Sequence, residues 1–337
     1  MAITAEWPWF MPVRNVEKEL DRLNLLREAE PQQAIPVLRK ALRDRVNLVV
    51  AKAAKIAAER EVRELIPDLT AAFERLFENP VRTDPQCWAK TALAKALVSL
   101  GHDQASTFLR GARYFQLEPV WGGQEDTASA LRSACVLALA VCRDISRKEV
   151  LAHIVEALAD QAAPVRIDAV RALESMDGDE SCLLLRLKAR LGDRELPVTG
   201  QVLESLLSIE GASAIDFVAD FLKSTDPELC AEAAMALASS RLPAAVEKLK
   251  TAFQEARNRE SRKSLLRALG TCREPSAIEF LFGVIASGRA VDATDAIAAL
   301  TFLAASADLR ERARQALAQR SEPDLHECFE RVFKVQT

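Results

Sequence analysis

Turn-forming residues and aromatic rings are scarce in this sequence. Its 337 residues include 11 glycines, 14 prolines and a single tyrosine, Tyr114, and aromatic residues make up 5%. A β-rich chain needs many tight turns and strands in which apolar residues alternate with polar ones, and this sequence has neither. We therefore exclude a β-rich fold and expect helices that pack closely through alanine and leucine.

An excess of charge of either sign is also missing. The chain has 45 basic and 49 acidic residues, so no overall field attracts it to nucleic acid or to an anionic membrane surface. No apolar stretch approaches the roughly 18 residues of a membrane-spanning helix, and the first residues do not resemble a secretion signal. We expect a cytoplasmic protein.

Paired cysteines and the common metal-binding and catalytic motifs are missing as well. The 7 cysteines are odd in number and never spaced as CxxC, which is typical of small buried side chains in a reducing compartment. Only one histidine, His326, is followed by a glutamate, and neither HExxH nor GxSxG occurs. We predict that the protein is not an enzyme and has no catalytic residues, no metal site and no cofactor.

What the sequence does contain is a repeat. Ala- and Leu-rich segments recur, and their equivalent leucines lie 30 to 42 residues apart, the spacing of a helical hairpin repeat. Each of these segments is predicted to be the second helix of a pair. Amphipathic runs between them, such as 150–160 and 245–256, predict the first helices. The equivalent leucines are Leu97, Leu139, Leu173, Leu207, Leu237, Leu269 and Leu300.

Two stretches, LADQAAPVRIDAVRALESM at 158–176 and LKSTDPELCAEAAMALASS at 222–240, resemble HEAT repeats, in particular the short bacterial HEAT-like kind. The resemblance extends over about residues 31–305. It implies an all-α fold, an α-α superhelix that is a right-handed solenoid of antiparallel helix pairs. In such a fold the first helices form the convex side and the second helices line the concave side.

The predicted organisation is a single continuous domain. Residues 1–30 are an N-terminal segment and capping helix, 31–305 are a solenoid of about eight helix pairs, and 306–337 are C-terminal capping helices. The segment WPWFMP at 7–12 is interpreted either as a hydrophobic seal over the first helices or as a short linear motif for another protein.

The longest interval between equivalent leucines contains an expanded loop at 111–126, with Tyr114, Phe115 and Trp121. Insertions in solenoids project from one face, often the binding face, and aromatic residues dominate the binding energy of many protein interfaces. We interpret this loop as partner-binding. The alternative is that the three rings fill a widened gap between neighbouring repeats.

These features favour a protein-binding scaffold or adaptor that uses the concave face and the 111–126 loop. Arg132, Arg166 and Arg171 are expected to pair with acidic side chains of the partner protein. Two alternatives stay open: a nucleic-acid-binding protein with a groove like that of HEAT-like DNA glycosylases, and a lyase-like or maturation factor for a chromoprotein. Acidic residues interrupt the basic ones along the second helices, which argues against a continuous phosphate track.

Overall fold

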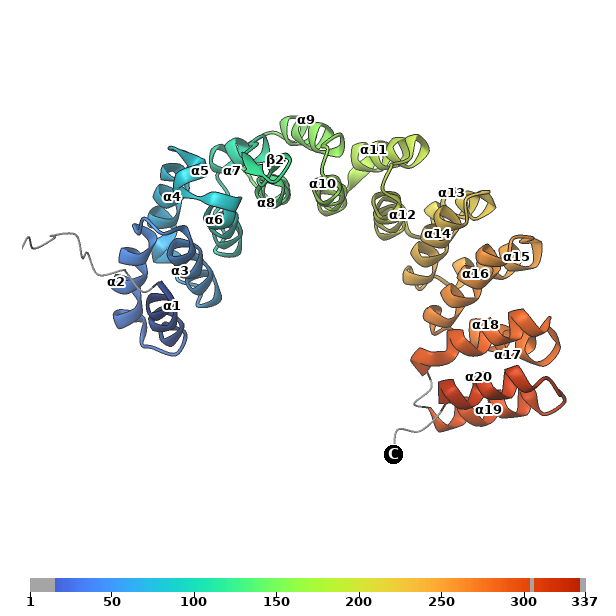
Figure 1. Ribbon diagram of the computed structural model, residues 1–337. Coiled ribbons are helices and arrows are strands. Elements are labelled where there is room, and N and C mark those ends of the chain that lie inside the picture. The colour runs from blue at the N-terminus through green and yellow to red at the C-terminus, as the bar shows by residue number, and fades with distance from the viewer. Residues whose placement is uncertain (1–15, 304–305, 334–337) are drawn as a thin grey trace, which may run out of the picture. The chain divides into compact units, whose positions relative to one another are not determined.

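The structure of the protein, a computed structural model, describes residues 16–303 and 306–333. Within these residues it is almost entirely helical, with one two-stranded hairpin, and its helices stack as successive pairs (Figure 1). The predicted all-α class and the solenoid of helix pairs are confirmed. The two interpretations of the 7–12 segment concern residues outside the described ranges and stay predictions.

The chain divides into two compact units, Met1–Ala169 and Val170–Thr337. In the first unit, α2, α4 and α7 form one layer, and α3, α6 and α8 form a second layer in which α6 packs against both of its neighbours (Figure 1). The elements of this unit are α1 Val16–Asn24, η1 Leu25–Arg27, α2 Pro31–Leu42, α3 Asn47–Glu59, η2 Arg63–Leu65, α4 Ile66–Arg75, α5 Pro80–Thr83, η3 Pro85–Cys87, α6 Trp88–Ser99, α7 Ala105–Ala112, β1 Leu117–Val120, β2 Gly123–Asp126, α8 Ser129–Leu139 and α9 Arg147–Leu158. Helix α10, Ala163–Met176, begins in the first unit and ends in the second.

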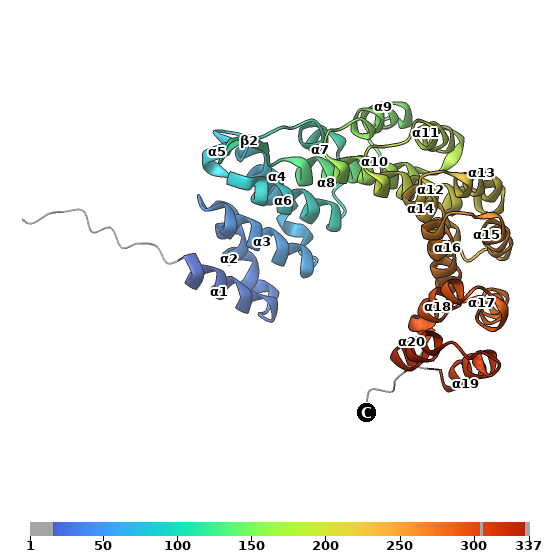
Figure 2. The same ribbon diagram turned by 45° about the vertical axis from the view of Figure 1, so that its right-hand side comes forward.

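In the second unit, α12, α14, α16 and α18 pack side by side in one layer, and α13, α15, α17 and α19 form the other (Figure 2). The elements are α11 Gly178–Leu191, α12 Leu196–Glu210, η4 Gly211–Ala214, α13 Ile215–Ala219, η5 Asp220–Lys223, α14 Pro227–Ser239, α15 Pro243–Glu255, α16 Arg259–Cys272, α17 Pro275–Ser287, α18 Ala290–Ala299, η6 Leu300–Leu303, α19 Ala307–Leu317 and α20 Pro323–Phe333. All seven equivalent leucines are buried, none of them more than 4% exposed. Their regular spacing therefore follows the core of the stack.

Several helices begin at the prolines and capping residues of the sequence. Helices α2, α14, α15 and α17 each begin at a proline, whose missing amide proton costs nothing in the first turn. The carboxylate of Asp226 accepts a hydrogen bond from the Glu228 amide at 2.9 Å and so caps α14. None of the helices in residues 16–303 and 306–333 is long and apolar enough to cross a membrane.

Basic side chains in the first turn of several second helices reach back to carbonyl groups at or just after the end of the first helix of the pair. In the second unit, Arg262 of α16 donates to the carbonyls of Phe253 and Ala256 at 2.7 and 3.1 Å. Its other nitrogens donate to both carboxylate oxygens of Asp292 in α18 at 3.0 and 2.9 Å. One guanidinium thus joins α15, α16 and α18. We call such a residue a first-turn staple; the others are Lys90, Arg132 and Arg166.

Because Arg262 is paired with the Asp292 carboxylate, the stability that this contact contributes depends on pH. Burial alone would raise the pKa of Asp292, but hydrogen bonds from Arg262 and Arg289 outweigh burial and lower the pKa to about 2. Because the native pKa lies below the ordinary value of 3.8, the stabilisation is present above pH 4 and is lost as the pH falls toward 2. The side chain is only 3% exposed, so solvent screens this effect little.

Replacing Asp292 by asparagine should therefore lower the free energy of unfolding by about 2 kcal/mol at neutral pH. The difference from the wild type should shrink to about half that value by pH 3, because the wild-type carboxylate then becomes protonated on unfolding. Urea unfolding followed by circular dichroism at both pH values measures the difference. A gap that stays constant from pH 7 to pH 3 would show that the ionised carboxylate is not the stabilising group.

Helix α16 also approaches the end of α18 closely at Gly270. A Cβ atom at this position would lie 2.3 Å from the carbonyl oxygen of Ala299, a backbone atom that cannot turn away. Gly283 in α17 is different, because a Cβ atom there would have no neighbour within 4 Å. A side chain therefore has no room at Gly270, whereas it has room at Gly283.

The variant Gly270→Ala should be destabilised by about 1–3 kcal/mol, because the helices must move apart or the backbone must shift. Gly283→Ala should instead be stabilised by about 0.5–1 kcal/mol, since alanine loses less backbone entropy in a helix. Chemical unfolding of both variants under the same conditions tests the pair. Equal effects of the two changes would contradict the close approach.

Candidate functional site

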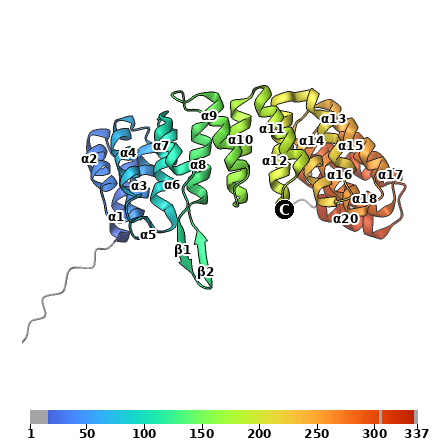
Figure 3. The same ribbon diagram turned by 90° about the horizontal axis from the view of Figure 1, so that it is seen from above.

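The expanded loop predicted at 111–126 contains a β-hairpin. Strands β1 and β2 pair in the register Leu117 with Asp126 and Val120 with Gly123, and Trp121 and Gly122 form the two-residue turn. Gly122 has φ +89°, in the left-handed region that favours glycine. The hairpin projects beyond the helices of the first unit (Figure 3). The sequence predicted an insertion here but not its two strands.

Large exposed apolar side chains gather around this hairpin. Of the fourteen in the described part of the chain, seven lie on the hairpin or on segments beside its base. Hydrogen bonds bring these segments together, from Asn47 to Asp84 and from Gln86 to Glu118. We call this set the apolar edge: Leu48, Val81, Trp88, Phe115, Leu117, Val120 and Trp121. A concentration of this kind is typical of an interaction surface.

The aromatic residues of the predicted site differ in exposure. Trp121, at the tip, has a relative accessibility of 104% and contacts nothing that would hide its ring. Phe115 is 56% exposed and lies under the Arg132 guanidinium, 4.0 Å from its ring centre. Tyr114 is partly buried and packs edge-on against Phe77 at 4.8 Å. Tyr114 thus belongs to the base of the hairpin, whereas Phe115 and Trp121 reach solvent.

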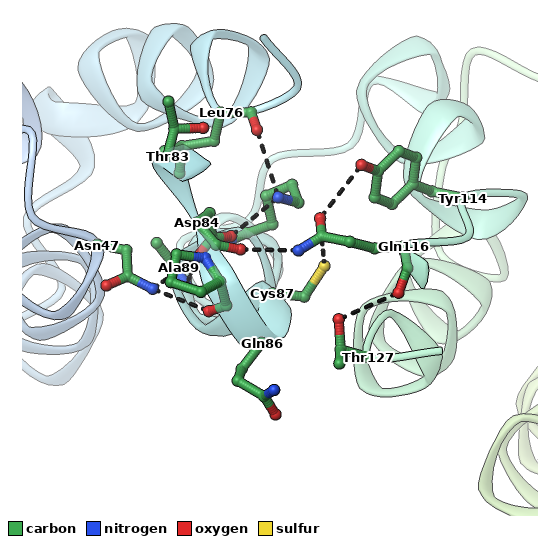
Figure 4. A network of polar contacts seen from close by, with 12 residues as sticks. Asn47, Leu76, Thr83, Asp84, Gln86, Cys87, Ala89, Tyr114, Gln116 and Thr127 are labelled. Atoms are coloured by element: carbon green, nitrogen blue, oxygen red, sulfur yellow. Dashed lines mark hydrogen bonds and ion pairs between the residues drawn. The ribbon is translucent and has the colours of Figure 1, made fainter. Parts of the chain in front are cut away.

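A buried ion pair lies beneath the hairpin. Asp84 and Lys90 are both fully buried, with 3.1 Å between the Asp84 carboxylate and the Lys90 ammonium. The carboxylate also accepts from the amides of Ala89 and Lys90, both at 2.9 Å, and from the Asn47 side chain at 3.0 Å (Figure 4). The Lys90 ammonium donates to the Leu76 carbonyl at 3.3 Å and faces the Phe77 ring. Both charges are therefore compensated by protein groups.

Gln116 and Glu118 connect the hairpin to this ion pair. The side-chain amide of Gln116 donates to the Asp84 carbonyl at 2.9 Å (Figure 4). It also donates to the Glu118 carboxylate at 2.6 Å. Glu118 also accepts from the Gln86 amide at 2.6 Å and from the Thr127 hydroxyl at 2.7 Å. Burial alone would raise the pKa of Glu118, but these hydrogen bonds outweigh burial and lower it. The Glu118 carboxylate is thus held ionised inside the base of the hairpin.

The turn that enters α6 is strained, and the same network holds it. Gln86 and Cys87 have φ values of 62° and 52°, which side-chain-bearing residues adopt at a cost of about 1 kcal/mol or more each. The Gln86 amide is bound by Glu118, and the next two amides after Trp88 are bound by Asp84. The strained turn is therefore held by two carboxylates, that of Glu118 on the hairpin and that of Asp84 in the segment before α6.

Burial keeps the two reactive-looking side chains of this network in their neutral forms. Burial raises the pKa of the Cys87 thiol and of the Tyr114 hydroxyl, each to about 12, so both stay protonated at neutral pH. Both donate to the same oxygen of Gln116, each at 3.2 Å. All seven cysteines are free, and residues 16–303 and 306–333 contain no group of three His, Cys, Asp or Glu side chains placed to hold a metal ion. The expectation that the protein is not an enzyme stays a prediction.

Two of the three arginines assigned to a partner have a different role. Arg132 is 1% exposed, and its guanidinium pairs with Asp160 at 2.8 Å and Asp126 at 2.7 Å. Arg166 is 3% exposed and donates to the carbonyls of Asp160 and Gln161. Both are first-turn staples in the interior of the first unit. Their assignment as charges offered to a partner is therefore corrected, because buried groups that are already paired present no free charge at the surface.

The third arginine, Arg171, lies in the second unit and is exposed, with its Nε donating to Gln201 at 3.0 Å. It is not part of the hairpin or of the apolar edge. The structure thus brings Tyr114, Phe115 and Trp121 together at the hairpin, and Arg171 belongs to the second unit. Sequence reasoning missed Trp88, whose exposed ring begins α6 beside the hairpin base. Its exposure had no local signal, because a tryptophan at a helix start also suits a core.

Two hollows adjoin Phe115. One, of about 230 Å³, is lined by Arg113, His153 and Glu156, and the other, of about 530 Å³, by Leu117, Asp126 and Ser129. A further hollow of about 780 Å³ lies in the second unit between α13 and α15. Its lining lysines are paired, Lys223 with Asp220 at 3.1 Å and Lys248 with Asp216 at 2.7 Å. Of these three hollows, the two at Phe115 are lined by exposed apolar side chains.

Known proteins resemble this chain through its fold. Residues 184–270 match the family model of HEAT repeats, which confirms the predicted HEAT resemblance for this part of the chain. No curated protein matches the chain.

Three solved structures are similar over most of this chain. They are human deoxyhypusine hydroxylase in complex with glycerol, with 20% identity over 77% of this chain and 92% of that chain and a TM-score of 0.30; an engineered protein, with 16% identity over 95% of both chains and a TM-score of 0.36; and Kap121p bound to Pho4p, with 12% identity over 92% of this chain and 42% of that chain and a TM-score of 0.39. At these identities and TM-scores the three matches carry no argument about what the protein does.

Replacing Asp84 by asparagine should destabilise the protein by about 3 kcal/mol or more, because it leaves the Lys90 ammonium buried without a counter-charge. Urea unfolding measures the loss. The double variant Asp84→Asn with Lys90→Met should recover part of it, since the methionine removes the stranded charge while keeping much of the volume. A double variant less stable than Asp84→Asn alone would contradict the ion pair as the stabilising unit.

Proposed function

We propose that this protein is a non-catalytic binding scaffold that presents the hairpin, with Trp121 at its tip, to a protein partner. The observation that supports this most strongly is a fully exposed tryptophan on a hairpin whose base is fixed by buried hydrogen bonds. Exposed tryptophan is costly in contact with water, and tryptophan is the residue most enriched among interface hot spots. The stack of HEAT repeats then serves to hold the hairpin in place.

A fixed hairpin base lowers the cost of binding. A loop that becomes ordered only in the complex loses conformational entropy at that moment, which weakens the affinity. Here Gln116 and Glu118 already hold β1 against the turn before α6. Only the Trp121 side chain and its immediate neighbours need to become ordered on binding.

Charge argues against nucleic acid as the partner of this surface. Between Arg113 and Arg132 the chain contains the acidic residues Glu118, Glu125 and Asp126 and no basic residue. A phosphate backbone is attracted only by local positive charge, and the neighbouring Arg132 and Arg166 are already engaged within the first unit. The surface therefore favours a protein.

The variant Trp121→Ala should lose the partner while keeping its fold. Truncation of a hot-spot tryptophan costs about 2–4 kcal/mol of binding energy, which corresponds to a loss of about 30-fold or more in affinity. The measurement is quantitative mass spectrometry of proteins captured from the native host by wild-type and variant protein, with thermal unfolding checked in parallel.

Leu187→Ala is the matched control, because Leu187 is a large exposed apolar residue, 55% accessible, on α11 in the second unit. Its captured proteins should equal those of the wild type. If no captured protein depends on Trp121, the hairpin tip is not the binding element and the proposal fails.

A further inference from the structure

The hydrogen-bonding phase of the hairpin determines which backbone groups point outward. The Thr127 amide donates to the Gln116 carbonyl at 3.0 Å, so this pair is a hydrogen-bonded pair of the ladder. In an antiparallel ladder hydrogen-bonded and non-hydrogen-bonded pairs alternate. Glu118 with Glu125 is therefore hydrogen-bonded, whereas Pro119 with Gln124 is not. The backbone groups of Pro119 and Gln124 point away from the hairpin, each toward its own free edge.

The two free edges are not equivalent. On β1 the outward positions are Leu117 and Pro119; proline has no amide proton to donate, and proline on an edge strand blocks further pairing. On β2 the outward positions are Gln124 and Asp126, and both have an amide proton and a carbonyl. Gln124 is exposed, and in the described part of the chain no other segment hydrogen-bonds to it. Proline thus interrupts the β1 edge, whereas the β2 edge is open to another strand along its length.

The β2 edge also carries an acidic side chain that no basic residue of the hairpin neutralises. Glu125 is exposed and forms no ion pair with any described residue, whereas the Asp126 carboxylate is taken up by Arg132 at 2.7 Å. Glu125 stands directly opposite Glu118, and like charges opposite each other destabilise a sheet. A positive charge beside Glu125 on the same face would remove this repulsion.

We propose that an extended, basic segment of a protein partner adds to β2 as a third strand. Its backbone pairs with the outward amide and carbonyl of Gln124, and a lysine or arginine lies directly opposite Glu125. This inference rests on the proposed function, since it names the partner segment that the hairpin binds. Trp121, at the end of the same strand pair, then contacts the apolar residues that flank the basic one.

Other occupants of this edge fit less well. The hairpin of a second copy of the chain would bring another acidic β2 strand to this one, and like charges would face each other. RNA or DNA would bring phosphates to a strand without positive charge. Charge complementarity therefore selects a basic polypeptide.

Phage-displayed random dodecapeptides selected on the full-length protein identify a probe without knowledge of the natural partner. The selected sequences should be rich in lysine and arginine. Fluorescence anisotropy then gives the dissociation constant of one selected, labelled peptide for each variant. Acidic selected sequences, or none that bind in solution, would overturn the inference.

Gln124→Pro removes the outward amide proton of Gln124 together with its exposed side chain and breaks no hydrogen bond between β1 and β2, so the hairpin should persist. This variant and Glu125→Lys should each weaken binding by about tenfold or more, the size expected for one lost hydrogen bond to a strand or one reversed charge pair. Glu64→Lys, which changes an exposed acidic residue of η2 outside the hairpin, should bind within about twofold of the wild type. Binding unchanged in both β2 variants would refute strand addition.

A change in the peptide tests the same geometry without any risk to the fold of the protein. N-methylation of successive backbone amides of the peptide should weaken binding at alternate positions, because every second amide of an added strand faces its neighbour. A peptide that tolerates methylation everywhere does not bind as a strand. If Trp121→Ala abolishes peptide binding while Gln124→Pro and N-methylation have no effect, the proposed function stands and strand addition is wrong.

Discussion

Wherever the two helices of a pair meet in a short turn, the last carbonyl groups of the first helix are buried without the intrahelical donors that satisfy the rest. In several pairs of this protein a basic side chain from the second helix donates to carbonyl groups at or just after the end of the first helix. Arg132 donates to the Tyr114 carbonyl at 2.9 Å, and Arg262 donates to the Phe253 carbonyl at 2.7 Å. Each of these arginines also donates to both carboxylate oxygens of an aspartate in the next repeat. The same guanidinium therefore fixes the geometry within a pair and the stacking of one pair on the next.

The pair formed by α4 and α6 uses the same principle with different residues, and the hairpin follows from that difference. Lys90 takes the place of arginine, and its counter-charge, Asp84, comes from the turn of its own pair and not from the next repeat. An ammonium group bonds one carboxylate as a point charge and cannot bridge two repeats as a guanidinium does. The link to the next repeat is supplied instead by Gln116 and Glu118 at the base of the hairpin. The base of the insertion thus helps to join two repeats, whereas its outer half is not needed for this link.

Sequence reasoning located the core better than the surface. The equivalent leucines were found because a buried position recurs once per repeat, whatever surrounds it. The strands were missed because each is four residues long, β1 contains a proline, and their stability depends on contacts such as that of Gln86 with Glu118, 32 residues apart. Arg132 and Arg166 were misplaced because residue type alone does not distinguish a basic residue that faces solvent from one that faces carbonyl groups. A signal existed: both occupy the fourth position of their helices, as Arg262 does.

A polar base also determines which side of the hairpin faces outward. Side chains alternate along a strand, so a shift of one residue would turn Leu117 toward the Asp84 network and expel Glu118. An apolar base would tolerate such a shift, because one aliphatic side chain can replace another with little loss. The Asp84 network does not tolerate it, since Gln86 and Thr127 would lose the carboxylate that accepts their hydrogen bonds. The buried network thus fixes the register, and the register decides that the blocked edge carries Pro119 and the open edge carries Glu125.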